Sequence, residues 1–262
     1  MKLVWSPETA SKAYLDTVKF VSNFLTIFVS YCKLLSILFS TSLMKSVIGF
    51  CLQCELYQES GVAELVSAMA AGWNANFIVE TWSKGGIMAT SIGLAVASGH
   101  TGGRHVCIVT DEQSRLEYVE GMVEVGMSPE IIVGEAEEVM DELVGMDFMV
   151  VDCMRKDFIR ILRLAKLSSR GAVLVCKNAS SLRPASTFKW RSVLDGNGNG
   201  GSRRLVRSVF LPVGMGLDIA HVAASGNEGN PGSSSGSGSG SVKWIKHVDQ
   251  KSGEEHVIRK VK

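Results

Sequence analysis

Five short apolar runs, separated by stretches with helical periodicity, constrain the fold of this chain most strongly. The runs are continuously apolar instead of alternating, which is typical of strands that are buried on both faces. Because strand and helix alternate, we predict an α/β fold in which helices cover both faces of a parallel sheet. The predicted strands lie at residues 77–79, 105–109, 130–133, 148–152 and 172–176, and the helices between them at residues 87–98, 114–126, 137–144 and 158–166.

Two further strand-like runs follow, at residues 205–211 and 216–223. Pro212 to Met215 connect them, and so short a connection makes an antiparallel hairpin, because a parallel crossover needs about a dozen residues. Five parallel strands followed by an antiparallel hairpin form the layout of the Rossmann-like class I methyltransferase fold. We therefore predict that fold, with a parallel sheet and a C-terminal antiparallel hairpin.

Polar residues and glycines follow several of the predicted strands. Ligands of parallel α/β sheets bind outside the carboxyl ends of the strands, so these residues define a candidate site. Asp111 and Glu112 suit a nucleoside, because one carboxylate can accept hydrogen bonds from both ribose hydroxyls. Gly85 and Gly86 let a ligand approach the backbone closely. The alternative is that the carboxylates are solvated loop residues. The other polar residues at this edge are Glu80, Glu135, Asp152, Lys177 and Asn178.

Residues 80–223 resemble the caffeoyl-CoA and catechol type of O-methyltransferase. VDCMRKDF at residues 151–158 looks like that family's V-D-A-D-K-D-N-Y motif, and LPVGMG at residues 211–216 is similar to its L-P-x-G-D-G turn. Glu80 with Gly86, and residues 134–136, resemble its cofactor motifs. The resemblance implies S-adenosylmethionine as the cofactor. Its binding residues would be Glu80, Gly85, Gly86, Asp111, Glu112, Glu135 and Ala136.

Four other stretches resemble the signatures of a plant-specific family of unknown function within the S-adenosylmethionine-dependent methyltransferase superfamily. They are MKLVWSPETA at residues 1–10, AGWNA at 71–75, HTGGRH at 100–105 and WIKH at 244–247. This resemblance covers nearly the whole chain except residues 20–53.

The chain departs from the O-methyltransferase pattern at the metal site. That family holds a divalent metal with an Asp after the fourth strand and an adjacent Asp-Asn pair after the fifth. Here the three residues are Asp152, Lys177 and Asn178. Hard cations need oxygen ligands, and Lys177 supplies a positive charge instead, so we expect no metal. Asp152 and Lys177 are the candidate catalytic residues: Lys177 either pairs with Asp152 or, if partly desolvated, serves as a base. Trp82 replaces a glycine of the cofactor motif, which predicts an obstructed cofactor path.

An apolar segment at residues 20–53 follows an amino-terminal helix predicted for residues 1–19. It holds no acid and only two charges, Lys33 and Lys45. A membrane span is one interpretation, but Lys33 divides the apolar run below the roughly 20 residues that a span needs. We favour an insertion produced by a retained intron, because pyrimidine-rich codons translate into Phe, Leu, Ser, Ile and Cys. Sequencing of the mature transcript tests this hypothesis.

Composition limits the partners and the compartment. The 262 residues carry a net charge of +1, which gives no general argument for a nucleic acid or a membrane surface. A basic cluster at Arg203, Arg204 and Arg207 lacks the interleaved aromatics of an RNA-binding face. Six cysteines form no disulfide framework, so we expect a cytoplasmic protein, or a membrane-associated one if residues 20–53 span a bilayer.

The predicted domain organisation has three parts after the apolar segment. Residues 54–224 would form the Rossmann domain, 225–241 a Gly/Ser linker and 242–262 a second hairpin.

We therefore predict a metal-independent, methyltransferase-like protein that binds S-adenosylmethionine and acts on a small molecule of unknown identity, with a homodimer as one possible assembly. The alternative is a non-catalytic binding or regulatory protein on a degenerate methyltransferase fold. Trp82 and Lys177 favour the alternative, whereas the acids at the strand ends favour the enzyme.

Overall fold

The structure is a computed structural model that describes residues 5–38, 61–182, 188–194, 205–223, 243–248 and 255–260. The chain divides into two compact units, residues 1–226 and 227–262. The strands of the first unit are β1 (Phe77–Thr81), β2 (Arg104–Val109), β3 (Glu130–Val133), β4 (Val144–Met146), β5 (Phe148–Asp152), β6 (Lys166–Leu167), β7 (Gly171–Lys177), β8 (Leu205–Leu211) and β9 (Leu217–Ala223).

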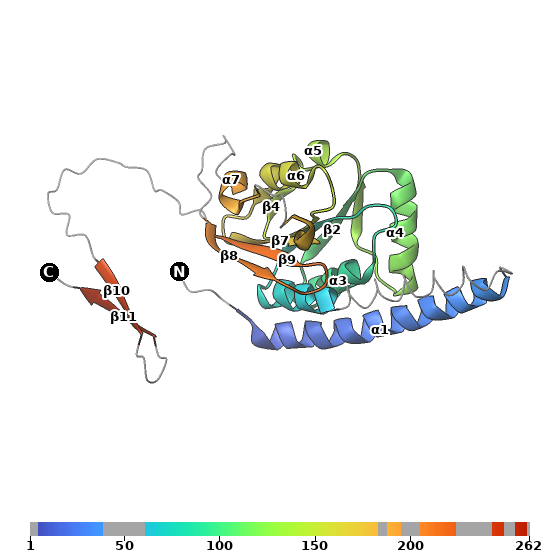
Figure 1. Cartoon of the computed structure of the whole chain (residues 1–262), viewed down its shortest axis with the longest axis horizontal. Coiled ribbons are helices and arrows are strands. Elements are labelled where there is room, and N and C mark those ends of the chain that lie inside the picture. The colour runs from blue at the N-terminus through green and yellow to red at the C-terminus, as the bar shows by residue number, and fades with distance from the viewer. Residues whose placement is uncertain are drawn as a thin grey trace. The chain divides into compact units, whose positions relative to one another are not determined.

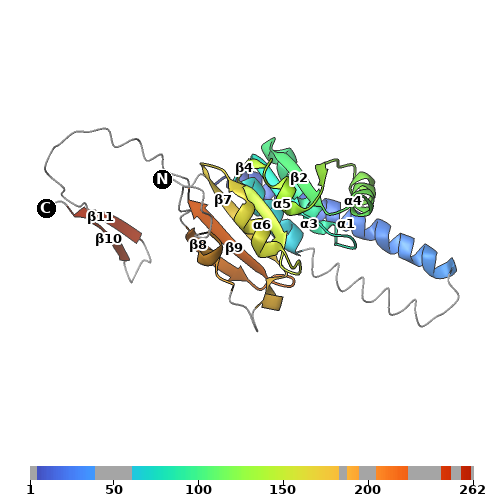
Figure 2. The same ribbon diagram turned by 90° about the horizontal axis from the view of Figure 1, so that it is seen from above.

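Seven of these strands form one sheet in the order β3-β2-β1-β5-β7-β9-β8. The first five run parallel, β9 is antiparallel to β7, and β8 is antiparallel to β9. Figure 2 shows β8 and β9 beside β7 at one side of the sheet. The five predicted parallel strands and the terminal hairpin are all present. The predicted Rossmann-like class I methyltransferase fold is therefore confirmed.

Burial explains why the strand sequences are continuously apolar. Every residue of β1 and β7 is buried, and in β5 only the last residue, Asp152, is partly exposed. Successive side chains of a strand point to opposite faces, so a strand that is buried throughout must be covered on both. At the sheet edge, β3 has no fully buried residue.

Helices supply this cover on both faces. In Figure 1, α1 and α3 lie on one side of the sheet, and α5, α6 and α7 lie on the other. The helices are α1 (Pro7–Leu38), an unlabelled helix at residues 61–72, α3 (Ala89–Thr101), α4 (Glu112–Glu124), α5 (Ala136–Val139), α6 (Phe158–Leu164), the 3-10 helix η1 (Ala179–Leu182) and α7 (Trp190–Leu194).

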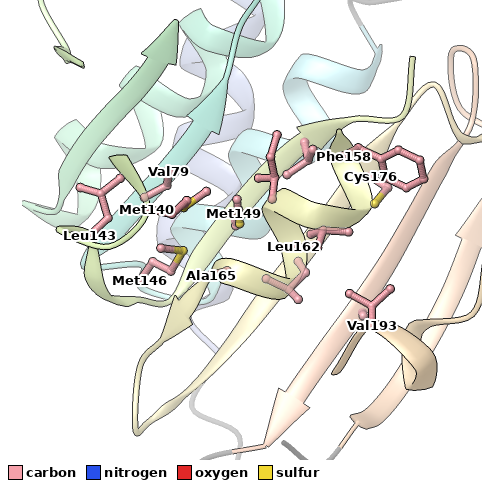
Figure 3. Packing of buried hydrophobic residues seen from close by; sticks show 14 of the residues in the cluster. Val79, Met140, Leu143, Met146, Met149, Phe158, Leu162, Ala165, Cys176 and Val193 are labelled. Carbon is pink, nitrogen blue, oxygen red and sulfur yellow. The ribbon is translucent and has the colours of Figure 1, made fainter. Parts of the chain in front are cut away.

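The apolar core is built on both faces of the sheet. On the side of α5, α6 and α7, Met149 and Cys176 of the sheet pack with Met140, Leu162 and Val193 (Figure 3). On the other side, the helix at residues 61–72 and α3 pack against β1, β5 and β7. These two cores fix the strands, and therefore hold the carboxyl ends of β1, β2, β5 and β7 in place.

The helix predicted at residues 137–144 is wrong over its second half. α5 ends at Val139, and the chain then enters β4, which pairs in parallel with β6 in a small second sheet. Met140 and Leu143 are buried in the same core as Met149, so their apolar character reflects burial and not helical periodicity.

The first helix is longer than predicted, because α1 continues without a break from residue 19 to Leu38. Val21 and Phe24 of this helix pack in the cluster that contains Trp82. Residues 39–53, the rest of the predicted insertion, lie outside the described residues. Over the part of the chain that the structure describes, no helix combines the length and apolarity that a membrane crossing requires.

The second unit contains an antiparallel pair of strands, β10 (Lys243–Val248) and β11 (Glu255–Lys260), in which His247 is the register partner of His256.

Candidate functional site

The carboxyl ends of the five parallel strands meet at one edge of the sheet. The strand order changes direction between β1 and β5, because β2 and β3 lie on one side of this pair and β7 lies on the other. In open α/β sheets this point leaves a crevice in which ligands bind. The candidate site is therefore the edge formed by the segments that follow β1, β2, β3, β5 and β7.

The loop after β1 has the glycine conformation that a close ligand approach needs. Gly85 has a φ of +74°, and a Cβ placed there would meet open space. A Cβ at Gly86 would lie 2.8 Å from the Ser83 carbonyl oxygen and 2.8 Å from Trp82 Nε1. Gly86 therefore has no room for a larger residue, because the loop is packed on the indole of Trp82.

Trp82 is buried in the core instead of lying in the crevice. Its side chain is 3% exposed and packs in a cluster with Ile92, Cys107 and Tyr118. The indole meets the Tyr118 ring edge-on, with the ring centroids 5.5 Å apart. The obstruction of the cofactor path that the sequence predicts is therefore not found.

Glu80 lies below the edge, in a buried hydrogen-bond network. Its Oε1 accepts a hydrogen bond from Tyr118 Oη at 2.7 Å and lies 3.0 Å from His105 Nε2, and its Oε2 accepts one from Ser91 Oγ at 2.9 Å. Burial acts to raise the pKa of Glu80, but the hydrogen bonds and the charge of His105 outweigh it and bring the pKa below its usual value. Glu80 thus links β1 to β2, α3 and α4. These partners indicate that Glu80 supports the loop after β1 from the interior of the protein.

Sequence reasoning missed the three partners of Glu80, because nothing in their local pattern distinguishes them from ordinary core residues.

Two polar groups that follow Glu80 in the chain are buried without a hydrogen-bond partner among the described residues: Thr81 Oγ1 and Trp82 Nε1. Thr81 is the last residue of β1, so its hydroxyl lies at the level where the crevice begins. A buried hydroxyl without a partner is costly, and a ligand that supplies the missing hydrogen bond would remove the cost.

Asp111 follows β2 and forms the N-cap of α4. Its Oδ1 accepts a hydrogen bond from the Ser114 backbone N–H at 2.7 Å, and its Oδ2 accepts from Thr110 Oγ1 at 2.9 Å. These hydrogen bonds lower the pKa of Asp111, and the one from the Ser114 backbone has the largest effect. Glu112 starts the helix and pairs with Arg115, which lowers the Glu112 pKa. Both carboxylates are exposed and ionised, so they remain able to accept hydrogen bonds from a ligand.

Glu135 and Ala136 lie where β3 passes into α5. Glu135 is exposed, and its carbonyl oxygen accepts the backbone N–H groups of Glu138 and Val139 at 3.0 and 3.1 Å. Ala136 is the first residue of α5. The backbone N–H of Gly134 donates to the Val109 carbonyl oxygen at 2.9 Å, which ties this turn to the end of β2. The two residues thus share the edge with Asp111.

Asp152 and Lys177 end the neighbouring strands β5 and β7 and are register partners. Asp152 Oδ1 accepts hydrogen bonds from the Met154 backbone N–H at 2.8 Å and from Asn178 Nδ2 at 2.9 Å. Lys177 is buried, with 8% of its surface exposed. The structure therefore brings Asp152, Lys177 and Asn178 to one place, as predicted from the motif.

These three residues do not form a good metal site. Asn178 turns its amide nitrogen toward Asp152, and Lys177 contributes a cation where a hard metal needs an oxygen. Over the described residues, no group of three or more His, Cys, Asp or Glu side chains has a metal-binding arrangement. The donor set thus disagrees with the divalent metal that the O-methyltransferase resemblance implies.

Arg155 connects the loops on the two sides of the crevice, and the sequence did not single it out. Its guanidinium donates to both carboxylate oxygens of Asp157, at 3.0 and 2.7 Å, and to Ser83 Oγ at 3.1 Å. Ser83 follows β1, whereas Arg155 follows β5. Only 12% of the Arg155 side chain is exposed. The ion pair with Asp157 orients the guanidinium within the loop after β5, and the hydrogen bond to Ser83 joins this loop to the loop after β1.

The strand order of the sheet is that of a Rossmann-like domain of the class I methyltransferase type. The chain belongs to the family described as "Protein of unknown function (DUF1442)", whose model matches residues 1–38 and 40–260. This match includes most of the predicted insertion at residues 20–53. Among curated proteins, none matches the chain.

Several solved structures are similar to the chain. A methyltransferase from Geobacter sulfurreducens is 19% identical, with 62% of this chain and 78% of that chain covered and a TM-score of 0.48. An O-methyltransferase of tomaymycin synthesis from Streptomyces achromogenes, in complex with SAM, is 24% identical, with 62% and 80% covered and a TM-score of 0.48. An O-methyltransferase from Bacillus cereus, in complex with SAH, is 16% identical, with 68% and 90% covered and a TM-score of 0.49. Because these TM-scores are all below 0.5, the assignment of the chain to this fold class rests on its own strand order.

Proposed function

We propose that this protein binds S-adenosylmethionine at the carboxyl edge of its sheet and transfers the methyl group to a small molecule without a metal. The observation that carries the proposal is the change of direction of the strand order between β1 and β5, because open α/β sheets bind their ligands at this point. The hydroxyl of Thr81, which has no hydrogen-bond partner among the described residues, and the open space beside the Cα of Gly85 support a ligand at this position. Glu80 would act from below, as a support of the loop.

The residues at the edge suit the parts of such a cofactor. Asp111 or Glu112 would accept hydrogen bonds from the ribose hydroxyls, because both are exposed carboxylates at the end of β2. Gly85 and Gly86 would face the cofactor through their backbone, and Glu135 and Ala136 would flank it at the end of β3. When bound, S-adenosylmethionine supplies an activated methyl group on a sulfonium. The protein's part is then mainly to align donor and acceptor.

Asp152 and Lys177 would lie on the acceptor's side of the site, at the ends of β5 and β7.

The second candidate function is a binding or regulatory protein that uses this fold without catalysis. The observation that favours it is the buried Lys177 at a position where the O-methyltransferase resemblance implies a metal ligand. Cofactor binding would fit both functions, and methyl transfer only the first.

Alanine at Asp111 is expected to weaken the binding of S-adenosylhomocysteine about tenfold or more, because a hydrogen bond to a charged acceptor is lost. Asp111 also caps α4, so the variant's thermal unfolding must be measured beside the calorimetric titration. Ser114→Ala is the matched control, because it removes one partner of the cap but keeps the carboxylate. Equal affinity in wild type and in both the Asp111→Ala and Glu112→Ala variants would exclude this edge as the ribose site.

Four narrower statements from the sequence remain predictions: the plant origin, the cytoplasmic location, the homodimer and the intron-derived segment at residues 20–53.

A further inference from the structure

A cavity lies away from the candidate site, at the end of the sheet where β2 and β3 begin. Its volume is about 460 Å³, which is within the usual range of small-molecule sites. The last part of α3, the start of β2 and the segment between α4 and β3 form its walls. The stretch HTGGRH at residues 100–105, which the candidate site does not use, supplies Gly103, Arg104 and His105 to the lining.

His105 forms the floor of this cavity. Among the described residues that line the cavity it is the only buried one, with 6% of its surface exposed. Its Nε2 lies 3.0 Å from Glu80 Oε1, a carboxylate that also accepts hydrogen bonds from Ser91 of α3 and Tyr118 of α4. The ring of His105 therefore lies on the face of β2 that α3 and α4 cover, which is also the face below the cavity.

The other ring nitrogen of His105 points toward the cavity. In the register of β1 and β2, Glu80 is level with Cys107, so it lies nearer than His105 to the carboxyl end of β2. The two nitrogens of an imidazole point away from each other, so Nδ1 points back toward the start of β2, where the cavity lies. Nδ1 is buried and has no hydrogen-bond partner among the described residues. Because such an atom is costly, a ligand that supplies the missing hydrogen bond is favoured.

The cavity offers a ligand no net charge. Arg104 donates two hydrogen bonds to Glu130, both at 2.7 Å, and these two residues carry the only fixed charges among the described lining residues. The ring of His105 faces the carboxylate of Glu80, which balances any charge on the imidazole. An ion that entered the cavity would lose water without gaining an unpaired partner of opposite charge. The lining therefore selects a neutral ligand.

The remaining lining selects the body and the polar group of the ligand. Ala95, Met127 and Pro129 contribute apolar side chains, which suit an apolar body. A hydroxyl suits Nδ1 best, because it donates to an unprotonated ring nitrogen and accepts from a protonated one. A carboxylate only accepts and an ammonium only donates.

We propose that this cavity binds a neutral small molecule with a hydroxyl group on an apolar body, and that the hydroxyl forms a hydrogen bond with Nδ1 of His105. Because Nδ1 is covered, the lining side chains shift slightly on binding, and Met127 is flexible enough to do so. The cavity and the candidate cofactor edge lie at opposite ends of β2, so this site does not depend on the proposed function.

The first test uses cyclohexanol as the probe. The full chain is titrated, and the ring nitrogen NMR signals of its histidines are followed. We expect the Nδ1 signal of His105 to move and to saturate in the millimolar range, which is typical of so small a ligand. Cyclohexanecarboxylate and cyclohexylammonium carry the same ring with a charge and should bind at least about tenfold more weakly. A His105 signal that does not respond in the folded protein, or an ion that binds as well as the alcohol, overturns the inference.

The second test closes the cavity at Gly99. This residue lies in the last turn of α3 and lines the cavity, and a Cβ placed there would meet open space. Gly99→Leu should weaken cyclohexanol binding at least about tenfold, since its side chain takes the space of the ligand. Gly99→Ala is the matched control, because both substitutions favour the helix and alanine adds little volume. Binding by Gly99→Leu that equals that of Gly99→Ala overturns the inference.

The third test removes the nitrogen itself. His105→Phe keeps a ring of similar size and should weaken cyclohexanol binding about threefold to tenfold, the range for one hydrogen bond. Thermal unfolding is measured beside the titration, because the substitution also removes a partner of Glu80. Unchanged affinity in folded His105→Phe contradicts the assignment of Nδ1. If this variant does not fold, Gly99→Leu and the Nδ1 signal of the wild type decide.

Discussion

Replacing Glu80 with alanine is expected to lower the free energy of unfolding by about 3–5 kcal/mol, the range for breaking a buried charged pair from one side. The variant leaves Tyr118 Oη, Ser91 Oγ and His105 Nε2 without their acceptor in a region closed to water. Urea unfolding followed by circular dichroism measures the loss. The result matters for function because the same network supports the loop that carries Gly85 and Gly86.

Two variants separate this network from general effects. Glu80→Gln keeps the size of the side chain and one acceptor oxygen, so its loss should be clearly smaller. Glu120→Ala changes an exposed acid on α4 and should alter the stability by less than about 0.5 kcal/mol. A Glu80→Ala variant as stable as Glu120→Ala would show that the buried network contributes nothing.

The difference between the wild type and Glu80→Ala also depends on pH. Because the folded protein lowers the pKa of Glu80, the ionised carboxylate stabilises the fold above its unfolded-state value of 4.5. This contribution is lost as the pH falls from 4.5 through the lower folded-state pKa. The stability difference should therefore be largest near neutral pH and shrink below pH 4.5.

Alanine at Asp147 is expected to lower the free energy of unfolding by about 2–4 kcal/mol. Asp147 is 2% exposed and accepts the backbone N–H groups of Asn76 and Phe77 at 3.0–3.1 Å, and Arg170 Nη2 at 2.9 Å. The N–H of Phe77 is buried, and a buried N–H left unpaired costs about 1–3 kcal/mol, whereas Asn76 is exposed and its N–H adds less. The ion pair with Arg170 adds less, because Arg170 is half exposed.

Chemical denaturation of Asp147→Asn provides the comparison. Asparagine keeps one acceptor oxygen, so roughly half of the loss should return. Arg170→Ala removes the exposed partner alone and should cost about 1 kcal/mol or less. If Arg170→Ala and Asp147→Ala lost the same stability, the backbone N–H groups would not be the main partners.

The fold could be predicted because burial on both faces leaves a strong mark in the sequence. Continuous apolar runs located β1, β2, β3, β5 and β7, and the short Pro212–Met215 connection fixed the terminal hairpin. The same argument failed at residues 137–144. There, buried residues follow a single helical turn and lead into β4, and periodicity cannot distinguish this from a longer helix.

The candidate site was predicted in its positions but not in its contacts. The motif placed Asp152 and Lys177 together, and the structure makes them register partners. Glu80, in contrast, is buried among His105, Ser91 and Tyr118, which come from three other elements. Such a long-range network follows from tertiary packing, and the local pattern of a single sequence carries no sign of it. Trp82 shows the same limit, since only packing decides whether a bulky residue enters a crevice or the core.

The most direct test of the central claim, that this edge binds S-adenosylmethionine, is a calorimetric titration of the full chain with S-adenosylhomocysteine. A cooperative unfolding transition should first confirm that the sample is folded. We predict one site with a dissociation constant in the micromolar range, roughly 8 kcal/mol of binding free energy, weakened at least about tenfold in Asp111→Ala. A folded protein that shows no binding up to millimolar ligand would contradict the claim and leave the fold without its proposed cofactor.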